Sequence, residues 1–95
     1  MFIISLTYKV SPQEVEKHLA AHIQFLDKYY HQGVFLLSGK KIPRTGGIIL
    51  ARCDTREQLE KIVDQDPFSE FGVADVEITE FCATKAGNGF DCLLD

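Results

Sequence analysis

The chain has 95 residues with 45% hydrophobic and 11% aromatic content, enough for the core of one small domain and too much for a disordered segment. A domain this short and this apolar is expected to hide part of its surface against a second copy of the chain. Its formal net charge of -4 offers no basic field to phosphate groups, so we expect no nucleic-acid partner.

The first predicted element is a strand at Phe2–Tyr8. Apolar side chains alternate along this segment, so one face of the strand is fully apolar. The apolar run that opens the chain is far too short to cross a bilayer and carries no basic flank. We therefore expect neither a membrane span nor a targeting segment.

A long amphipathic helix is predicted from Pro12 to Gln32. Ser11 is placed to cap its first turn, and Glu14 to complete a capping box. Gly33 follows the helix and can adopt the left-handed conformation that commonly ends one. Residues spaced alternately four and three apart predict the buried face of this helix: Val15, Leu19, His22, Leu26 and Tyr29.

Turn residues divide the rest of the chain into shorter elements. In chain order they are a buried strand at Val34–Ser38, a hairpin loop at Gly39–Gly47, a strand at Ile48–Cys53, a short helix opened by a capping signal at 54–57, and a strand at Val73–Phe81. The inner face of the short helix is predicted to hold Leu59, Ile62 and Val63.

The order strand, helix, strand, strand, helix, strand predicts an α+β fold of the ferredoxin-like βαββαβ type. In this fold a four-stranded antiparallel sheet carries both helices on one face, because right-handed crossovers place them on the same side. Strands that are apolar on both faces predict that a second subunit's sheet covers the other side. We therefore expect residues 1–82 to form one domain of a homodimer or higher homo-oligomer, with 83–95 as a C-terminal tail.

The chain contains three cysteines, Cys53, Cys82 and Cys92, and no Cys-x-x-Cys spacing. An odd set without metal-binding spacing argues for free thiols in a reducing compartment. The cysteines therefore predict a cytoplasmic protein.

His22 lies in the middle of the apolar helix face and is the strongest candidate for a functional side chain. A buried imidazole without a partner costs about 1–3 kcal/mol, so it needs a hydrogen-bonding group from elsewhere. Asp66 is the best candidate, because the proline after it places it at the end of the short helix. A paired histidine and carboxylate can transfer protons near neutral pH. The alternatives are a hydrogen-bonded core histidine and an aspartate that only caps a turn.

Two other groups of polar residues give weaker signals. His18 lies one turn before His22, and such a pair can bind a metal ion, but no third ligand is apparent, so we expect no metal. The predicted hairpin offers a hydroxyl, backbone amides and cations that can hold a small carboxylate or phenolate, from Ser38, Gly39, Lys40 and Arg44. An ordinary solvated hairpin explains these residues equally well.

Four short segments of the chain occur in a particular order and spacing. They are Ala-His-Ile-Gln-Phe-Leu at 21–26, Phe-Leu-Leu-Ser-Gly at 35–39, Thr-Gly-Gly-Ile-Ile-Leu at 45–50 and Asp-Pro-Phe at 66–68. Together they resemble the YciI-like family of the dimeric α+β barrel superfamily over about residues 2–82. Many members have proline after Ser-Gly where this chain has Lys40, so its pocket rim is expected to be more cationic.

The resemblance implies that His22 and Asp66 are the active-site pair and that two sheets pair face to face in a dimer. Relatives include muconolactone isomerase, antibiotic-biosynthesis monooxygenases and a dehalogenase of chlorinated hydroxyhydroquinone. They imply proton chemistry without a cofactor on a small aromatic or enolisable substrate. The expected function is thus a dehalogenase, lyase or isomerase type of enzyme. The alternative is a non-catalytic small-molecule-binding or accessory module.

Overall fold

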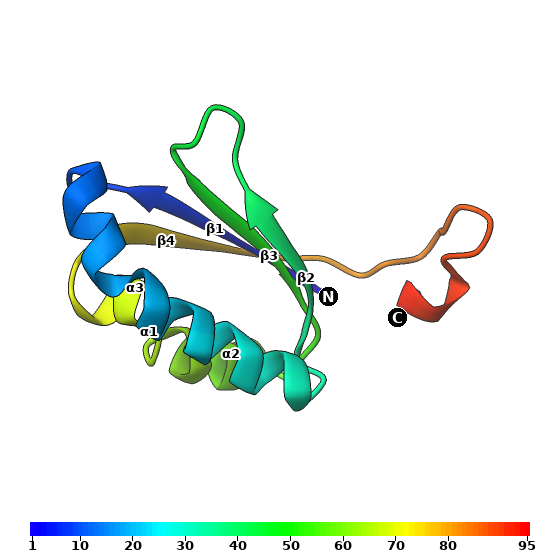
Figure 1. Ribbon diagram of the computed structural model, residues 1–95. Helices are drawn as coiled ribbons and strands as arrows, with labels where there is room; N and C mark the ends of the chain where they lie inside the picture. Colours follow the sequence, from blue (N-terminus) through cyan, green and yellow to red (C-terminus); the bar gives the residue numbers. More distant parts are fainter.

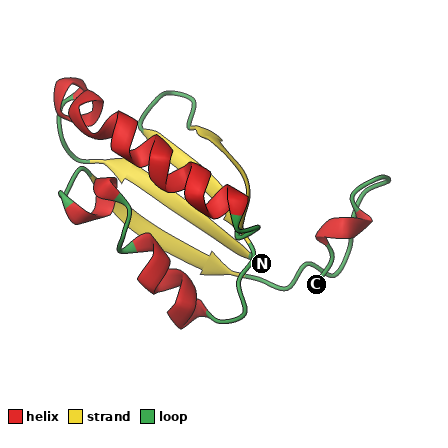
Figure 2. Ribbon diagram, turned by 60° about the horizontal axis from the view of Figure 1, so that its bottom comes forward, coloured by secondary structure: helices red, strands yellow, loops and turns green.

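The computed structural model describes residues 1–95 as one antiparallel sheet with helices packed on one of its faces (Figures 1 and 2). The elements are, in chain order, β1 (Phe2–Tyr8), α1 (Pro12–His31), β2 (Phe35–Lys40), β3 (Gly46–Ala51), α2 (Arg56–Val63), α3 (Pro67–Glu70), β4 (Ala74–Glu80) and a 3₁₀ turn, η1 (Asp91–Leu93). The four strands lie in the order β2-β3-β1-β4, each antiparallel to its neighbours. The predicted ferredoxin-like fold is confirmed. None of the helices combines the length and apolar character that crossing a membrane requires.

The two ends of α1 are capped by Ser11 and Gly33 as predicted, but Glu14 does not take its predicted part in the capping. Ser11 Oγ accepts a hydrogen bond from the N–H of Glu14, and Gly33 ends the helix with a φ of 78°. The predicted capping box is wrong in its second half. The Glu14 carboxylate accepts instead from Lys17 Nζ at 2.7 Å, and this bond lowers the pKa of Glu14.

The buried face of α1 is rotated slightly from the predicted one. Its fully buried residues are Val15, His22, Phe25 and Tyr29. Phe25 lies three residues after His22 and four before Tyr29, so it belongs to the same helical face as both. Leu19 and Leu26 are only half-buried, because they border the hollow described below.

The predicted bounds of the β2–β3 hairpin are wrong. β2 starts at Phe35 and continues to Lys40, while β3 runs from Gly46 to Ala51 rather than from Ile48 to Cys53. The glycines that suggest a loop are instead strand residues, because Gly46 pairs with Thr7 of β1. A Cβ at Gly46 would lie 1.7 Å from the carbonyl oxygen of Leu6, so only glycine permits this close backbone approach.

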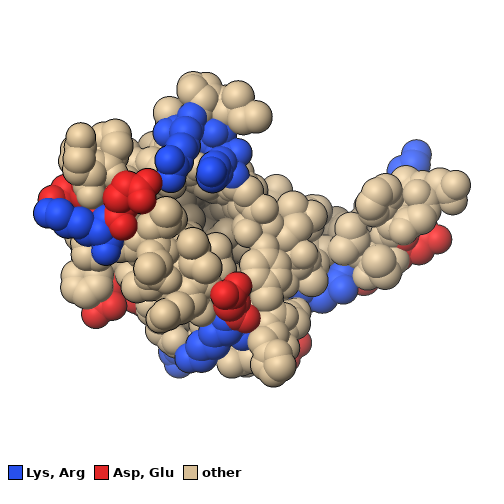
Figure 3. All heavy atoms as spheres, in the orientation of Figure 1, with Lys and Arg blue, Asp and Glu red and all other residues tan.

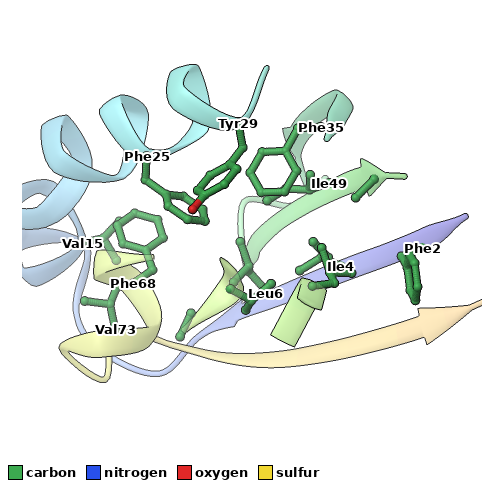
Figure 4. Close-up of a cluster of buried hydrophobic side chains, with 14 residues drawn as sticks. Phe2, Ile4, Leu6, Val15, Phe25, Tyr29, Phe35, Ile49, Phe68 and Val73 are labelled. Carbon is green, nitrogen blue, oxygen red and sulfur yellow. The ribbon is translucent and has the colours of Figure 1, made fainter. Parts of the chain in front are cut away.

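An aromatic cluster fixes α1 against the sheet. Phe25, Tyr29 and Phe35 pack together between α1 and the strands, with ring centroids 5.3 to 5.6 Å apart (Figure 4). Burying a side chain of this size contributes about 1.5–3 kcal/mol relative to leaving it exposed. The cluster lies one turn from His22 and therefore sets the position of that residue over the sheet.

The opposite face of the sheet is apolar over only part of its width. Ile3 of β1 pairs with Leu50 of β3, which pairs with Leu37 of β2, and the Leu37 side chain is 56% exposed. On the same face β4 presents the exposed carboxylates of Asp75 and Glu77. An apolar patch thus lies over β1–β3 beside an acidic strand.

The tail after β4 leaves the sheet and turns back toward the N-terminus (Figure 1). Asp95 Oδ2 accepts hydrogen bonds from the Ala83 N–H at 2.8 Å and from the Met1 ammonium at 3.2 Å. The Ala83 hydrogen bond, more than the Met1 ammonium, lowers the pKa of Asp95. Arg52, which follows β3, donates to the carbonyls of Cys92 and Leu94 and so holds the end of the tail.

We predict that Gly46→Ala destabilises the fold by at least about 3 kcal/mol, because the new methyl group must displace the backbone of β1. Gly39→Ala is the matched control, since a Cβ there meets no atom within 4 Å. Urea unfolding of both variants measures the difference. Equal stabilities would show that β1 and β3 do not approach as described.

Candidate functional site

His22 and Asp66 form a direct contact in the interior. His22 Nδ1 lies 2.7 Å from Asp66 Oδ1, and the two residues are 8% and 1% exposed. His22 projects from the middle of α1, while Asp66 precedes α3. The structure therefore brings together the two residues that the sequence singles out as a pair.

Asp66 fills both of the roles that the sequence leaves as alternatives. It is the N-cap of α3, and its Oδ1 accepts the Phe68 N–H at 2.9 Å as well as the His22 hydrogen bond. Pro67 occupies the first position of α3, where its missing N–H removes no helical hydrogen bond. The cap fixes the carboxylate, and the fixed carboxylate orients the imidazole.

Phe68 holds the plane of the imidazole. Its ring stacks on His22 with centroids 3.9 Å apart and planes only 4° from parallel. Tyr8, at the end of β1, packs against Phe68 in a T-shaped arrangement, with ring centroids 5.8 Å apart and ring planes at 86°. No role for Phe68 is predicted from the sequence, although an aromatic residue two positions after a capping aspartate is a usable signal.

The Asp66 contact decides which imidazole nitrogen is free. An ionised carboxylate can only accept hydrogen bonds, so Nδ1 of His22 carries the proton. Nε2 makes no hydrogen bond within the chain, and no fully buried side-chain nitrogen or oxygen is without a partner. Nε2 is therefore accessible at the wall of the adjacent cavity, where its lone pair can accept a proton.

This cavity, the His22 cavity, has a volume of about 280 Å³ and lies between α1 and the β2–β3 hairpin. Figure 3 shows the hollow with lysine and arginine side chains gathered beside it. Apolar side chains form most of its wall: Leu6, Leu19, Ile23, Leu26, Ile48 and Ile49. The polar part of the wall includes His22 and all four predicted hairpin residues, Ser38, Gly39, Lys40 and Arg44. The volume is close to the lower end of the range of about 300–1,000 Å³ for small-molecule sites.

The two cations of the His22 cavity have few partners of their own. Lys40 makes no ion pair, and Arg44 has only a long contact of 3.9 Å with Glu16. Ser38 differs, because its Oγ is 2.5 Å from the hydroxyl of Tyr30 and is held in place by it. The sequence gives no sign of this role for Tyr30, because its contact with Ser38 depends on how α1 packs against β2. Cations without a close anionic partner, beside an apolar wall, suit an anionic organic molecule.

His18 does not join His22. It stacks on Phe71 instead, with ring centroids 4.9 Å apart. No group of three or more histidine, cysteine, aspartate or glutamate side chains is placed to hold a metal ion.

Comparison with known proteins gives a family and a fold. A family model for the YCII-related domain matches residues 1–82, and no curated protein matches the chain. Nine chains among the solved structures match. One is 5-chloro-2-hydroxyhydroquinone dehydrochlorinase (TftG) from Burkholderia phenoliruptrix AC1100, in complex with 2,5-dihydroxybenzoquinone. It is 15% identical with a TM-score of 0.71, covering 87% of this chain and 95% of its own, a likeness that shows the fold alone.

We predict that His22→Ala and Asp66→Ala are coupled in stability. Each single change leaves a buried polar group without its partner and should destabilise by about 2–4 kcal/mol, while the double variant should show a coupling energy of about 1–3 kcal/mol. Loss of the α3 cap is common to both Asp66 variants and cancels in the cycle. Denaturant unfolding of the four proteins measures the coupling.

The matched control cycle uses His31→Ala and Asp64→Ala, since both residues are exposed and make no side-chain contact with each other. Their effects should add. A coupling energy near zero for His22 and Asp66 would contradict the contact.

Proposed function

The chain belongs to the family of proteins with a YCII-related domain, and we propose that it is an enzyme that uses His22 and Asp66 for general acid and base chemistry. The observation that carries the proposal is the orientation of one imidazole. Asp66 holds Nδ1 at 2.7 Å, and Nε2 is left free at the wall of a cavity. A histidine with a purely structural role has no need of an accessible second nitrogen.

The cavity supports a small anionic substrate with an apolar body. Its wall is largely aliphatic, while Lys40 and Arg44 supply positive charge. A phenolate, an enolate or an aromatic carboxylate combines these two properties. The structural neighbour is a 5-chloro-2-hydroxyhydroquinone dehydrochlorinase with 2,5-dihydroxybenzoquinone bound, and this supports a hydroxylated aromatic or enolisable compound here.

The proposed chemistry moves a proton through Nε2. In a dehydrohalogenation, Nε2 takes a proton from an O–H or C–H group of the substrate. The electron pair of that bond enters a new π bond, and the halide leaves with the electron pair of its bond to carbon. In an isomerisation the same proton returns to another atom of the substrate. Both reactions are balanced without an oxidant or reductant.

The residues around Nε2 have separate roles in this proposal. Asp66 stabilises the imidazolium that forms when Nε2 is protonated, and the Phe68 stack keeps the ring in its plane. Lys40 and Arg44 hold the anionic group and stabilise negative charge that develops on a substrate oxygen. Ser38, fixed by Tyr30, provides a hydroxyl to the same molecule.

We further propose that the protein is a homodimer joined through the apolar patch of its sheet. Leu37 and Leu50 are adjacent across β2 and β3, and Leu37 is 56% exposed. A contiguous apolar patch on the surface of a small domain commonly marks a site of association with another protein. A second sheet packed on this patch would leave the His22 cavity on the opposite face, next to the helices.

We predict that His22→Gln lowers kcat by at least about 100-fold, because general acid–base catalysis typically contributes that factor or more. Asp66→Asn should lower it less, since the amide still occupies the site but no longer stabilises an imidazolium. The assay follows product formation by chromatography with 5-chloro-2-hydroxyhydroquinone and a panel of muconolactones.

His31→Gln is the matched control and should retain the wild-type rate, because its side chain is exposed at the last residue of α1 and does not line the His22 cavity. Undiminished turnover in both the His22 and the Asp66 variant would exclude this mechanism. Ligand binding without product from any substrate would favour the non-catalytic binding module.

We predict that Leu37→Lys raises the dimer dissociation constant by at least about tenfold, because it places a charge in the patch that the proposed interface would bury. Ile42→Lys is the control, since Ile42 is 97% exposed at the tip of the hairpin. Light scattering across a concentration series measures both. A wild-type protein that is monomeric at micromolar concentration would remove the dimer proposal.

A further inference from the structure

A second hollow adjoins the His22 cavity, and we propose that it binds an apolar substituent of the same anionic substrate. The inference rests on the proposed function for the identity of the first cavity. On this inference the substrate is an acid that carries apolar groups on two sides of its anionic group. Neither the sequence nor the comparisons assign this second hollow to any ligand.

The position of the second hollow follows from the residues that line both spaces. It has a volume of about 380 Å³ and lies where the chain passes from β1 into α1. Tyr8 and Arg44 line it and also line the His22 cavity. The two spaces therefore meet at these two side chains, and one molecule can occupy both.

The rest of its wall is suited to an apolar group. Val10, Pro12 and Val15 contribute three aliphatic surfaces, and Thr45 contributes the fourth side. Val15 is only 3% exposed and belongs to the core, so this wall is firm. The only charged group of the second hollow is Arg44, at the junction.

Arg44 and Tyr8 are free to bind an anion at the junction. The Arg44 guanidinium makes no hydrogen bond within the chain, and its contact with Glu16 is 3.9 Å long. The Tyr8 hydroxyl also makes no hydrogen bond within the chain, while its ring rests edge-on against Phe68. Phe68 in turn stacks on His22. Phe68 is thus the ring that lies between Tyr8 at the junction and the proposed base.

The arrangement favours an acid with two apolar arms over a single-ring acid. One arm would lie against the aliphatic wall beside His22 and the other against Val10 and Val15, with the charge between them at Arg44. A single-ring acid leaves one of the two walls exposed to water. The number of apolar arms should therefore determine affinity.

Phenylacetate and diphenylacetate test this, because they carry the same carboxylate with one ring or two. Isothermal titration calorimetry of the wild-type protein should give an affinity for diphenylacetate about tenfold or more above that for phenylacetate. Thr45→Trp fills the second hollow and should reduce this ratio to below about twofold. The substitution keeps the backbone hydrogen bonds of Thr45 with Tyr8 and Pro43.

Thr84→Trp, in the tail, is the matched control and should keep the wild-type ratio. Thr45→Phe fills less of the hollow and should give an intermediate ratio, which supplies a second variant if the tryptophan impairs folding. Arg44→Gln should weaken both acids at least about threefold, since both lose the cation.

Equal affinities of the two acids for the wild-type protein would overturn the inference, as would a Thr45→Trp ratio equal to that of the wild type. The inference would also be overturned if the wild-type protein bound neither phenylacetate nor diphenylacetate. These outcomes are separate from the proposed function. Turnover of a single-ring substrate that is lost in His22→Gln would leave the His22–Asp66 chemistry standing while the second subsite fails.

Discussion

One carboxylate oxygen joins two parts of the chain that are 44 residues apart. Asp66 Oδ1 accepts a hydrogen bond from His22 on α1 and another from the first turn of α3. Neither the imidazole nor the carboxylate can be buried alone without a cost of about 1–3 kcal/mol or more, so each requires the other. The aromatic cluster behind α1 and the Phe68 stack then leave the imidazole little freedom to turn. This shared oxygen fixes the geometry on which any chemistry of the site depends.

The fold leaves only one atom of this pair, Nε2 of His22, beside a cavity. Nδ1 is engaged, the ring face is covered by Phe68, and Nε2 borders a hollow between α1 and the β2–β3 hairpin. The hairpin brings Lys40 and Arg44 to the same hollow although its strands begin and end at other residues than predicted. Its register depends on Gly46, which allows β3 to lie close to β1. A proton acceptor, an apolar wall and two cations thus meet in one place.

The sequence predicts the fold, and it predicts the His22–Asp66 pair for a clear physical reason. A histidine within an apolar helix face demands a partner, and an aspartate before proline is a natural one. What the sequence does not reveal depends on packing. Phe25 is more deeply buried than Leu19 and Leu26 because those two leucines, although they pack against the core, also border the hollow. The stack of Phe68 on His22 and the hydrogen bond between Tyr30 and Ser38 join separate elements, so no local pattern encodes them.

The tautomer of His22 tests the geometry most directly, and nitrogen-15 NMR of the imidazole can observe it. The described contact requires a proton on Nδ1, hydrogen-bonded to Asp66, and the proposed site requires an Nε2 whose resonance moves when phenylacetate is added. A proton found on Nε2 with Nδ1 bare would contradict the pairing, and an Nε2 resonance that does not move when phenylacetate is added would contradict the site built on it.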